Sequence, residues 1–589
     1  MTTRVSDVLD ATAAQHPDRP AMKARRDGRW HATTWREYRE QARRVARGYI
    51  ALGLQPGDGV SIIGFNRPEW FLADIGAILA GGVPAGIYTT STAAQCHYIT
   101  EHADCSIAVA ENPAQLAKLK EIRPRLPGLK ALVLMTGNES GEGVVTWEQL
   151  LALGAAQPEA ALDARIAAQR PDDACTLIYT SGTTGNPKAV MITHDNITFM
   201  GQTLKALYRL GPDDAVISYL PLSHIAEQVV TMHGPLATGA CTSFAQSMEQ
   251  LGDDLREVRP TLFVAVPRVW EKIEEKMVAA GASSPPLRRR IAAWARKVGL
   301  AGGYADQQGR SRPLAYPLAD RLVYSKVRAR LGLDRCRVAA SSAAPIAKST
   351  LEFFLSLGIP ICEVYGMSEC TGPATASLPE RYRTGKAGYC LPGVELKIAA
   401  DGEICMRGRH VFKGYYKGAA ATAEMMDAEG WLKSGDIGTL DADGFLQVTD
   451  RKKNLLITSG GENIAPQVIE GELLGIPVIS QAVVIGDRRK YLAALVTLDP
   501  AKLAATTVEA GSDAKDVAAA AACPRYRAWM QGRIDEVNQR LARVQTIKRF
   551  EIVAGEFTIE GGELTPTMKI KRKAVEAKYA AQIERMYAD

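Results

Sequence analysis

The densest run of chemically active residues is a decapeptide, Tyr179-Thr-Ser-Gly-Thr-Thr-Gly-Asn-Pro-Lys188. Hydroxyl groups, glycines and a lysine follow directly on a β-rich stretch that ends at Tyr179. Glycines let backbone N–H groups approach phosphate oxygens closely, hydroxyls add donors, and the lysine adds a positive charge. The spacing differs from the Walker A pattern GxxxxGK[ST]. The run therefore predicts a phosphate-binding loop of another type, and the alternative is a polar surface turn.

Further motifs follow this loop in a fixed order. They are Tyr365-Gly-Met-Ser-Glu369, Trp431-Leu-Lys-Ser-Gly-Asp436, Asp450-Arg-Lys-Lys453, Ser459-Gly-Gly-Glu-Asn463 and Thr565-Pro-Thr-Met-Lys569. Together with the loop, this order resembles the adenylate-forming enzymes, which include acyl-CoA synthetases, luciferases and the adenylation domains of peptide synthetases. The resemblance extends over nearly the whole chain. Any one motif alone would be weak, whereas the ordered set is specific.

Several other segments resemble the long-chain acyl-CoA synthetases. They are Leu220-Pro-Leu-Ser-His-Ile-Ala226, Val266-Pro-Arg-Val-Trp-Glu-Lys272, Leu318-Ala-Asp-Arg-Leu-Val-Tyr324 and Ser342-Ala-Ala-Pro-Ile346. Gly86-Ile-Tyr-Thr-Thr90, Met367-Ser-Glu-Cys-Thr-Gly372 and Ile476-Pro-Val-Ile479 are most similar to the bubblegum-type synthetases of long and very long chains. The resemblance implies an ATP-dependent fatty acid–CoA ligase. Such an enzyme forms acyl-AMP and pyrophosphate first, and acyl-CoA and AMP second.

This chemistry explains the residue types, because the substrate carboxylate is itself the nucleophile that attacks the α-phosphorus of ATP. No Ser-His-Asp set is needed, and the sequence has no GxSxG motif. The protein must supply positioning and positive charge. The resemblance implies that the phosphates of ATP are bound by Thr180, Ser181, Gly182, Thr183, Thr184, Gly185, Lys188 and Ser368.

The same resemblance implies the metal and nucleotide contacts. Glu369 would bind Mg²⁺, helped by the hydroxyl of Thr183, although a Glu beside a Ser is also typical of a helix start. The Tyr365 ring would stack on adenine. The rest of the adenine and ribose site would comprise Ser342, Ala343, Ala344, Gly366, Asp436 and Arg451. Without the resemblance, Asp436 after Ser-Gly is equally typical of a turn.

Three further roles have structural alternatives. Lys569 would bridge the carboxylate and the α-phosphate, with Lys571 as the rival if the register differs by two; alone, this run is typical of a solvated basic tail. His224 would lie near the reacting carboxylate or be a hydrogen-bonded core histidine. Trp270 matches a gating tryptophan over the fatty-acid tunnel of long-chain enzymes, and the alternative is a core residue.

The elements that position these groups predict an α/β fold. The chain of 589 residues is too long to fold around a single hydrophobic core, so we expect at least two domains. β-Rich runs at 59–64, 131–135, 177–179 and 262–266 alternate with helical stretches such as 35–52, which favours mainly parallel sheets. Asp443-Gly444 predicts a hairpin within 440–448.

We predict an N-terminal adenylating domain over 1–449, a hinge over 450–453, and a small α/β lid over 454–589. The resemblance makes Lys453 the pivot of a lid that rotates between the two half-reactions. One lid face would present Lys569. The other would present Gly460 and Gly461, where small residues let the pantetheine arm of coenzyme A pass.

Residues 274–333 form a basic insert rich in Ala, Arg and Lys, with Arg288-Arg289-Arg290. We expect two or more amphipathic helices around a polar loop at 302–313. One interpretation is solvated helix faces. The other is a surface that rests on anionic lipid at the inner face of a membrane and collects fatty acid there.

Composition sets the remaining expectations. A net charge of +6, with 46% hydrophobic and 23% charged residues, is ordinary for a globular protein and argues against a nucleic-acid partner. Ten scattered cysteines without CxxC spacing predict reduced thiols and no structural zinc. The N-terminus lacks a secretory signal, and residues 71–88 read as a buried helix followed by a strand, so we expect a cytoplasmic protein. We expect it to be a monomer or a homodimer.

Two rival functions remain open. The first is an adenylating enzyme for a non-fatty or ring-containing acid, or for a carrier-protein acceptor, although we expect no carrier domain because the chain ends at Asp589. The second is a non-catalytic protein that binds acyl-AMP or lipid as a regulator. That second function would require loss of Lys569, Glu369 or Asp436, all of which are present.

Overall fold

Eight strands form the largest sheet, in the order β19-β9-β8-β4-β3-β5-β6-β7, in a computed structural model that describes residues 3–139, 141–180, 186–458, 462–564 and 570–588. The strands from β8 to β7 are parallel, whereas β9 and β19 run antiparallel to their neighbours. Their bounds are β3 Gly59–Ile63, β4 Val83–Ile87, β5 Cys105–Ala110, β6 Ala131–Leu134, β7 Val144–Thr146, β8 Ala174–Thr180, β9 Lys188–Thr193 and β19 Gly414–Tyr415.

Helices cover both faces of this sheet, as mainly parallel sheets require. On β3, Val60 and Ile62 pack in one core with α2 and α3, whereas Ile63 packs in a second core with α4 and α5. The helices are α2 Trp35–Ala51, α3 Pro68–Leu79, α4 Ala93–His102 and α5 Pro113–Ile122. The α3–β4 unit confirms the buried helix and strand expected over 71–88.

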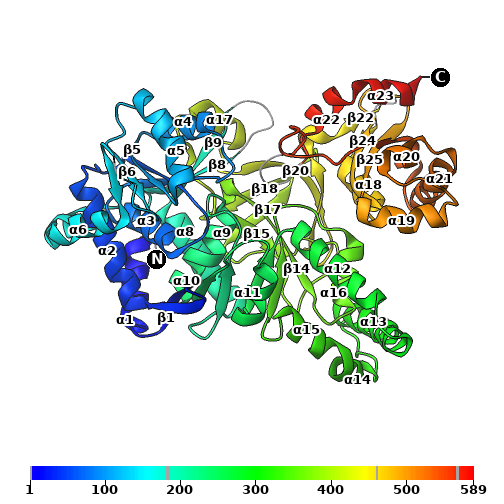
Figure 1. Cartoon of the computed structure of the whole chain (residues 1–589), viewed down its shortest axis with the longest axis horizontal. Coiled ribbons are helices and arrows are strands. Elements are labelled where there is room, and N and C mark those ends of the chain that lie inside the picture. The colour runs from blue at the N-terminus through cyan, green and yellow to red at the C-terminus, as the bar shows by residue number, and fades with distance from the viewer. Residues whose placement is uncertain (1–2, 140, 181–185, 459–461, 565–569, 589) are drawn as a thin grey trace.

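Three more sheets complete the N-terminal part (Figure 1). The first contains β12 Leu262–Ala265, β13 Val338–Ser341, β14 Ile361–Met367, β15 Gly372–Ala376 and β16 Tyr389–Cys390. The second contains β10 Ala215–Ser218, β11 Cys241–Phe244, β1 Pro20–Arg26 and β2 Arg29–Thr34. The third is antiparallel and contains β17 Val394–Ile398, β18 Glu403–Gly408, β20 Leu432–Leu440 and β21 Leu446–Arg451. The pairing of Leu440 with Leu446 confirms the predicted hairpin.

The C-terminal part packs around its own interior. Two hydrophobic clusters lie there, and their buried members all fall between Leu456 and Met586. The elements are β22 Leu456–Ile457, β23 Asn463–Ile464, α18 Pro466–Leu473, β24 Ile479–Ile485, β25 Leu492–Leu498, α19 Pro500–Glu509, α20 Val517–Ala522, α21 Pro524–Asn538, β26 Ile547–Val553, α22 Arg572–Lys578 and α23 Ala580–Tyr587. The boundary predicted at 449–454 stays a prediction.

The basic insert is helical, but its loop begins later than predicted. The helices are α12 Pro267–Ala282, α13 Pro286–Gln307, α14 Tyr316–Ala319 and α15 Ser325–Leu331, with a π-helical turn η3 Asp320–Tyr324. The prediction of a loop from Gly302 is wrong because Gly302 and Gly303 lie inside α13. A Cβ on Gly302 would stand 2.4 Å from the Tyr316 ring, and one on Gly303 would stand 2.3 Å from Leu355. Glycine is therefore used here for close packing between helices.

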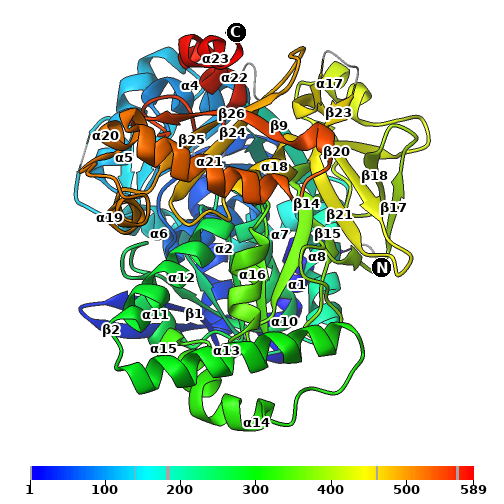
Figure 2. The same ribbon diagram turned by 90° about the vertical axis from the view of Figure 1, so that its right-hand side faces the viewer.

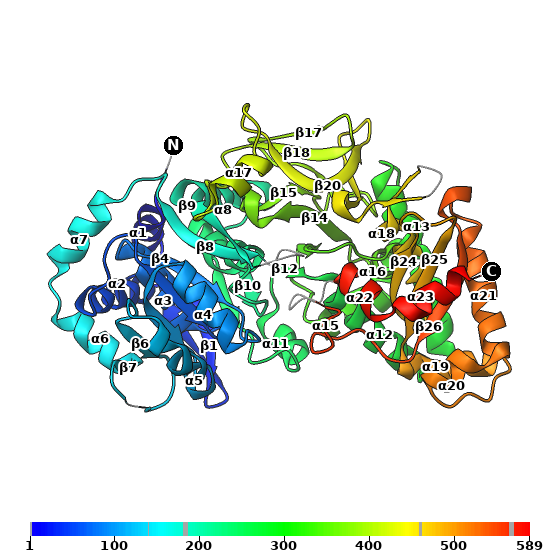
Figure 3. The same cartoon turned by 90° about the horizontal axis from the view of Figure 1, so that it is seen from above.

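Figure 2 shows α13 and α14 at one end of the molecule, with the C-terminal α22 and α23 at the other. In the view from above, β17, β18 and β20 lie at the top, between β8 and β9 on the left and the C-terminal β24 and β25 on the right (Figure 3). Within the described ranges, every helix is too short or too polar to cross a membrane.

Candidate functional site

Three of the predicted nucleotide-binding residues are joined directly. The Tyr365 hydroxyl at the end of β14 donates to Asp436 Oδ2 over 2.9 Å. Arg451 Nε lies 2.7 Å from Asp436 Oδ1, and the two residues face each other across β20 and β21. Burial raises the pKa of the Tyr365 phenol well above its ordinary value, and the charge of Asp436 raises it further. Tyr365 therefore stays a hydrogen-bond donor, and the Asp436 carboxylate is fixed in orientation.

The backbone around these residues is unusually close-packed. Ala343, in the segment after β13, has a φ of +74°, which residues other than glycine rarely adopt. Such outliers cluster at functional sites. At Gly366, a Cβ would stand 1.8 Å from the carbonyl oxygen of Gly372 on β15. The absence of a side chain at Gly366 is thus required by the pairing of β14 with β15. Of the two residues that flank Ala343, Ser342 is half-buried and Ala344 is exposed.

Glu369, the predicted metal ligand, is held by a residue that the sequence analysis missed. Glu369 is buried beside Ser368 at the turn after β14. The Tyr415 hydroxyl donates to Glu369 Oε1 over 2.7 Å. Lys188 Nζ lies 4.9 Å from the centroid of the same tyrosine ring. Tyr415 therefore links the predicted metal ligand to the predicted phosphate-binding lysine. The aromatic pair after Gly414 was the available signal, but its pairing with β9 is visible only in the fold.

Several predicted residues lie outside the described ranges. These are Ser181, Gly182, Thr183, Thr184, Gly185, Gly460, Gly461 and Lys569. Their flanks are described. Thr180 and Lys188 pair directly at the ends of β8 and β9. Leu564 and Ile570 form an antiparallel bridge, and Lys571 N–H donates to the Glu563 carbonyl over 2.7 Å.

Positive charges from both parts of the chain act on Lys453, the predicted pivot. The pKa of Lys453, on the short turn after β21, is lowered first by burial and then by the neighbouring positive charge of Arg451. Lys188 of the N-terminal part and Lys573 of the C-terminal part lower it further. A concentration of ammonium and guanidinium groups next to Asp436 is suited to a polyanion such as a triphosphate.

His224 caps a short helix whose last residue, Glu227, has a buried carboxylate that was not predicted from the sequence. His224 Nδ1 accepts from the Ala226 N–H over 3.2 Å at the start of α9 Ile225–Glu227. Glu227 Oε1 accepts from Ser218 Oγ at 2.7 Å and from Tyr219 N–H at 3.0 Å.

Two more donors, Thr231 Oγ1 and Asn66 Nδ2, lie 3.1 Å from the same Glu227 oxygen. Asn66 also binds the Leu220 carbonyl at 2.7 Å. Burial raises the pKa of Glu227 to about 7 despite these hydrogen bonds. The network fixes the segment that ends at His224. In the sequence, the only sign of this network was the single acidic residue that follows His224-Ile-Ala226.

Trp270 lies in a packed interior. Its side chain is fully buried, and its indole N–H donates to the Ala340 carbonyl over 3.1 Å. Its ring packs edge-on against Phe263 and Phe354. These contacts are those of a core tryptophan in this structure, and its role as a gate stays a prediction.

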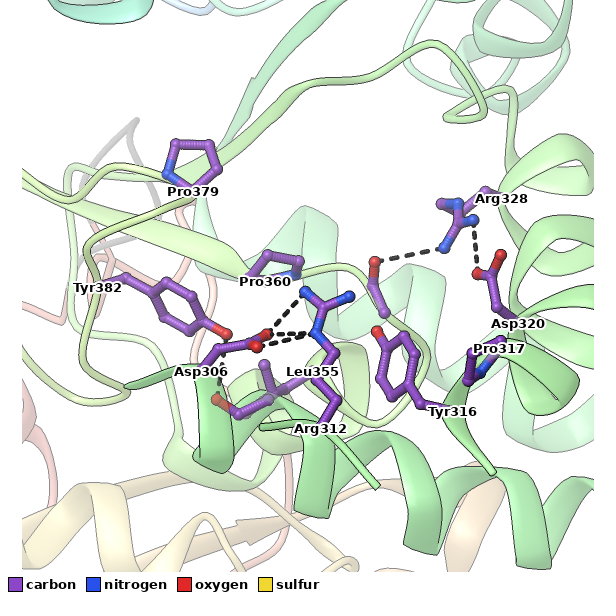
Figure 4. A pocket seen from close by; sticks show the side chains of 12 residues that line it. Asp306, Arg312, Tyr316, Pro317, Asp320, Arg328, Leu355, Pro360, Pro379 and Tyr382 are labelled. Atoms are coloured by element: carbon purple, nitrogen blue, oxygen red, sulfur yellow. Dashed lines mark hydrogen bonds and ion pairs between the residues drawn. The ribbon is translucent and has the colours of Figure 1, made fainter. Parts of the chain in front are cut away.

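A polar pocket of about 410 Å³ lies between the basic insert and residues 355–382, and its lining includes none of the site residues described above. Figure 4 shows two ion pairs on opposite walls, Asp306 with Arg312 and Asp320 with Arg328. None of the predicted site residues is among those lining it.

The comparisons with known proteins agree with this geometry. The family of AMP-binding enzymes matches residues 9–416, and its C-terminal domain matches residues 453–589. The chain therefore belongs to the AMP-binding enzyme family. It is 43% identical to the long-chain-fatty-acid–CoA ligase ACSBG2 of Xenopus laevis, covering 99% of this chain and 84% of the relative. It is 39% identical to ACSBG1 of Bos taurus over 99% of this chain and 85% of the relative. The predicted resemblance to the bubblegum-type branch is confirmed.

Solved structures share the fold. The anthranilate CoA ligase AuaEII with anthranoyl-AMP gives a TM-score of 0.74 at 19% identity, covering 99% of this chain and 98% of that chain. The A domain of carboxylic acid reductase from Segniliparus rugosus, with AMP and a co-purified carboxylic acid, gives 0.75 at 22% identity, covering 99% and 94%. The predicted α/β fold is confirmed.

Tyr415→Phe should weaken use of the metal without unfolding the protein. The change removes the hydrogen bond to Glu369 and keeps the ring beside Lys188. A hydrogen bond to a charged group is worth about 1.5–3 kcal/mol, so the half-saturating Mg²⁺ concentration in pyrophosphate release should rise roughly tenfold or more. Tyr416→Phe is the matched control, because its hydroxyl donates to Asp104 instead. Equal metal titrations for the two variants would contradict the assignment.

Glu227→Gln should stabilise the protein increasingly as pH rises. Burial raises the folded-state pKa of Glu227 from 4.5 to about 7, so folding favours the protonated acid. Its contribution to stability is complete below about pH 4.5 and is lost as pH rises through 7. Glutamine cannot ionise, so its advantage should grow by about 3 kcal/mol between those limits. Unfolding midpoints across this pH range measure the difference. The control Glu429→Gln, at an exposed position, should not change the unfolding midpoint with pH. If the effect of Glu227→Gln does not depend on pH, the raised pKa of Glu227 is contradicted.

Proposed function

We infer that this protein is an ATP-dependent fatty acid–CoA ligase. Carboxylate and ATP give acyl-AMP and pyrophosphate, and acyl-AMP and coenzyme A then give acyl-CoA and AMP. The observation that carries this conclusion is the direct linkage of Tyr365, Asp436 and Arg451, from three ordered motifs, in a chain of the AMP-binding family. The relatives at 39–43% identity are long-chain-fatty-acid–CoA ligases, which supports long-chain acids as substrates.

The described side chains support distinct parts of the first half-reaction. Asp436 is oriented by Tyr365 and Arg451 to accept hydrogen bonds from ribose hydroxyls. The remaining face of the Tyr365 ring is assigned to adenine. Lys188 and Lys573 supply positive charge for the phosphates, and Lys569 is assigned to the carboxylate and α-phosphate. Fixed charges of this kind stabilise the transition state without reorganising during the reaction.

Glu369 fits one carboxylate ligand of Mg²⁺. Its Oε1 accepts from Tyr415, whereas its Oε2 has no hydrogen bond from any described residue. Mg²⁺ is usually bound by one or two carboxylates together with substrate phosphates. Within the described ranges no cluster of three or more His, Cys, Asp or Glu could hold an ion alone, so the phosphates of ATP would complete the ligand set, with Thr183 as the assigned hydroxyl. Bound Mg²⁺ would neutralise phosphate charge.

The second half-reaction requires the C-terminal lid to turn about Lys453, with Gly460 and Gly461 assigned to the coenzyme A channel. Separate hydrophobic interiors support this proposal, because rotation leaves both intact. The polar contacts between the two parts include Lys502 with Glu275 at 3.5 Å, an exposed pair that costs little to break.

The acyl site and the setting of the enzyme complete the proposal. His224 is assigned to the neighbourhood of the reacting carboxylate, and Trp270 to the acyl-pocket gate. We assign the enzyme to the cytoplasm, as a monomer or homodimer.

Lys569→Ala should separate the half-reactions. Removal of a charge that acts where two anions meet should lower pyrophosphate release roughly a hundred- to a thousandfold. Thioester formation from supplied acyl-AMP should fall far less. Both rates are measured with a panel of fatty and ring-containing acids, with and without coenzyme A, so the same assay identifies the acid and the acceptor.

Lys571→Ala is the matched control, two residues away, and should retain both rates within a few-fold. Equal losses in the two half-reactions of Lys569→Ala would refute its assignment. The selective pattern in Lys571→Ala instead would move the role to that residue. Absence of coenzyme A-dependent thioester formation with every acid would refute the ligase itself.

A further inference from the structure

The strongest charge asymmetry in the chain lies in the insert, away from the nucleotide site. Residues 286–331 contain eleven Lys and Arg against two Asp, a formal charge of +9. The whole chain carries +6, so the remainder is net negative, at −3. The excess of positive charge is therefore a local property of α13 to α15. Charge confined to one region indicates an anionic partner for that region.

The same region exposes large apolar side chains. Exposed fractions are Leu314 101%, Leu287 70%, Leu318 53%, Leu322 42%, Ile291 37% and Trp294 37%. Single exposed leucines are ordinary on protein surfaces, whereas six large apolar residues within 36 positions of a strongly basic segment are not. Arg288, Arg289, Arg290 and Arg321 are interspersed among them and are also exposed.

These side chains are exposed because the helices pack through other faces. Ala295 of α13, Ala319 of α14 and Tyr324 of η3 form a small buried cluster that joins the helices. Leu314, Leu318 and Leu322 recur every four residues along the segment through α14 and η3, on the side that does not make this contact. Figures 1 and 2 both place α14 at the edge of the molecule, with no element beyond it.

The pocket of about 410 Å³ is lined in part by residues of the same segment. Tyr316 and Pro317 line it, and Leu314 and Leu318 flank them in sequence. Arg312 donates from Nε and Nη2 to Asp306 at 2.8–3.0 Å. This leaves Arg312 Nη1 without a hydrogen-bond partner anywhere in the described parts of the chain. The guanidinium lies 4.5 Å from the Tyr316 ring centroid, which fixes its plane. An arginine oriented by a carboxylate and an aromatic ring presents a free edge suited to phosphate.

We propose that α13, α14 and η3 form a docking surface for an anionic phospholipid bilayer, with a headgroup phosphate seated in the Arg312 pocket. The exposed leucines and Trp294 enter the interface between headgroups and acyl chains, while the arginines contact anionic headgroups. Basic amphipathic segments with Trp and Leu bind bilayers in this way. Only the benefit of docking rests on the proposed function: fatty acids partition into bilayers, so a docked enzyme meets its substrate there.

Vesicle flotation tests the surface without any turnover, so its failure would leave the proposed reaction untouched. The intact protein should float with vesicles of phosphatidylcholine and phosphatidylglycerol, and much less with phosphatidylcholine alone or at high salt. The combined variant Leu314→Asp, Leu318→Asp, Leu322→Asp should lose roughly tenfold in partitioning for each leucine. The combined variant Arg288→Ala, Arg289→Ala, Arg290→Ala should lose roughly fivefold for each arginine.

Val508→Asp is the matched control, since Val508 is 80% exposed on α19 of the C-terminal part. Its partitioning should equal that of the unmodified protein. Thioester formation from a short, water-soluble fatty acid should stay unchanged in the leucine variant, which shows that it folds. The proposal is overturned if the unmodified protein ignores anionic vesicles, or if the leucine variant floats as well as Val508→Asp. It is also overturned if sedimentation shows a dimer that the leucine substitutions dissociate.

The pocket has its own matched pair. Arg312→Lys keeps the charge but loses the planar fork, and it should weaken binding to anionic vesicles several-fold. Arg310→Lys, two residues away on the same loop, should have no effect. Inorganic phosphate, added at constant ionic strength, should reduce vesicle binding by the unmodified protein and should not reduce vesicle binding by Arg312→Lys. Identical binding by both variants would overturn the headgroup pocket.

Discussion

The arrangement of the candidate nucleotide site depends on the contacts of the Asp436 carboxylate. Asp436 is 5% exposed and joins Tyr365, 71 residues earlier in the chain, to Arg451 in the predicted hinge. A buried charge is tolerated only when it is paired and hydrogen-bonded. Loss of either partner would leave that charge uncompensated. The five-stranded sheet, through Tyr365, and the antiparallel sheet, through Asp436 and Arg451, are thus joined at one side chain, which is also the proposed ribose acceptor.

A second buried acid, at the end of β21, extends this connection to the C-terminal part. Asp450 is 1% exposed, and its Oδ2 accepts from the Gln467 N–H over 2.7 Å in the first turn of α18. Burial raises the pKa of Asp450 to about 6. The last strand of the N-terminal part therefore caps a helix of the C-terminal part. Because the C-terminal part packs around its own interior, the proposed rotation of a lid would leave both cores intact.

The sequence predicted elements whose causes are local and missed contacts whose causes are not. The strands β3, β6, β8 and β12 and the hairpin at Asp443-Gly444 follow from alternation and turn chemistry, and the structure has them. Gly302 and Gly303 were misassigned to a loop because their packing partners, Tyr316 and Leu355, are distant in sequence. The contacts of Tyr415 and Glu227 were not predicted, because only strand pairing and burial reveal their partners. The roles of Lys569 and the phosphate loop remain predictions from resemblance.

Positive charge is used twice in this chain, and the two uses are spatially separate. At the candidate nucleotide site, Lys188 and Lys573, from different segments, both lower the pKa of Lys453, and such a concentration of positive charge suits a compact polyanion. In the insert, arginines from one continuous segment are spread among exposed leucines, which suits an extended anionic surface. Because α14 lies at the end of the molecule opposite α22 and α23, a protein docked through α14 would leave the far side of the lid clear of the bilayer (Figures 1 and 2). The proposed docking would thus leave room on that side for the proposed rotation of the lid.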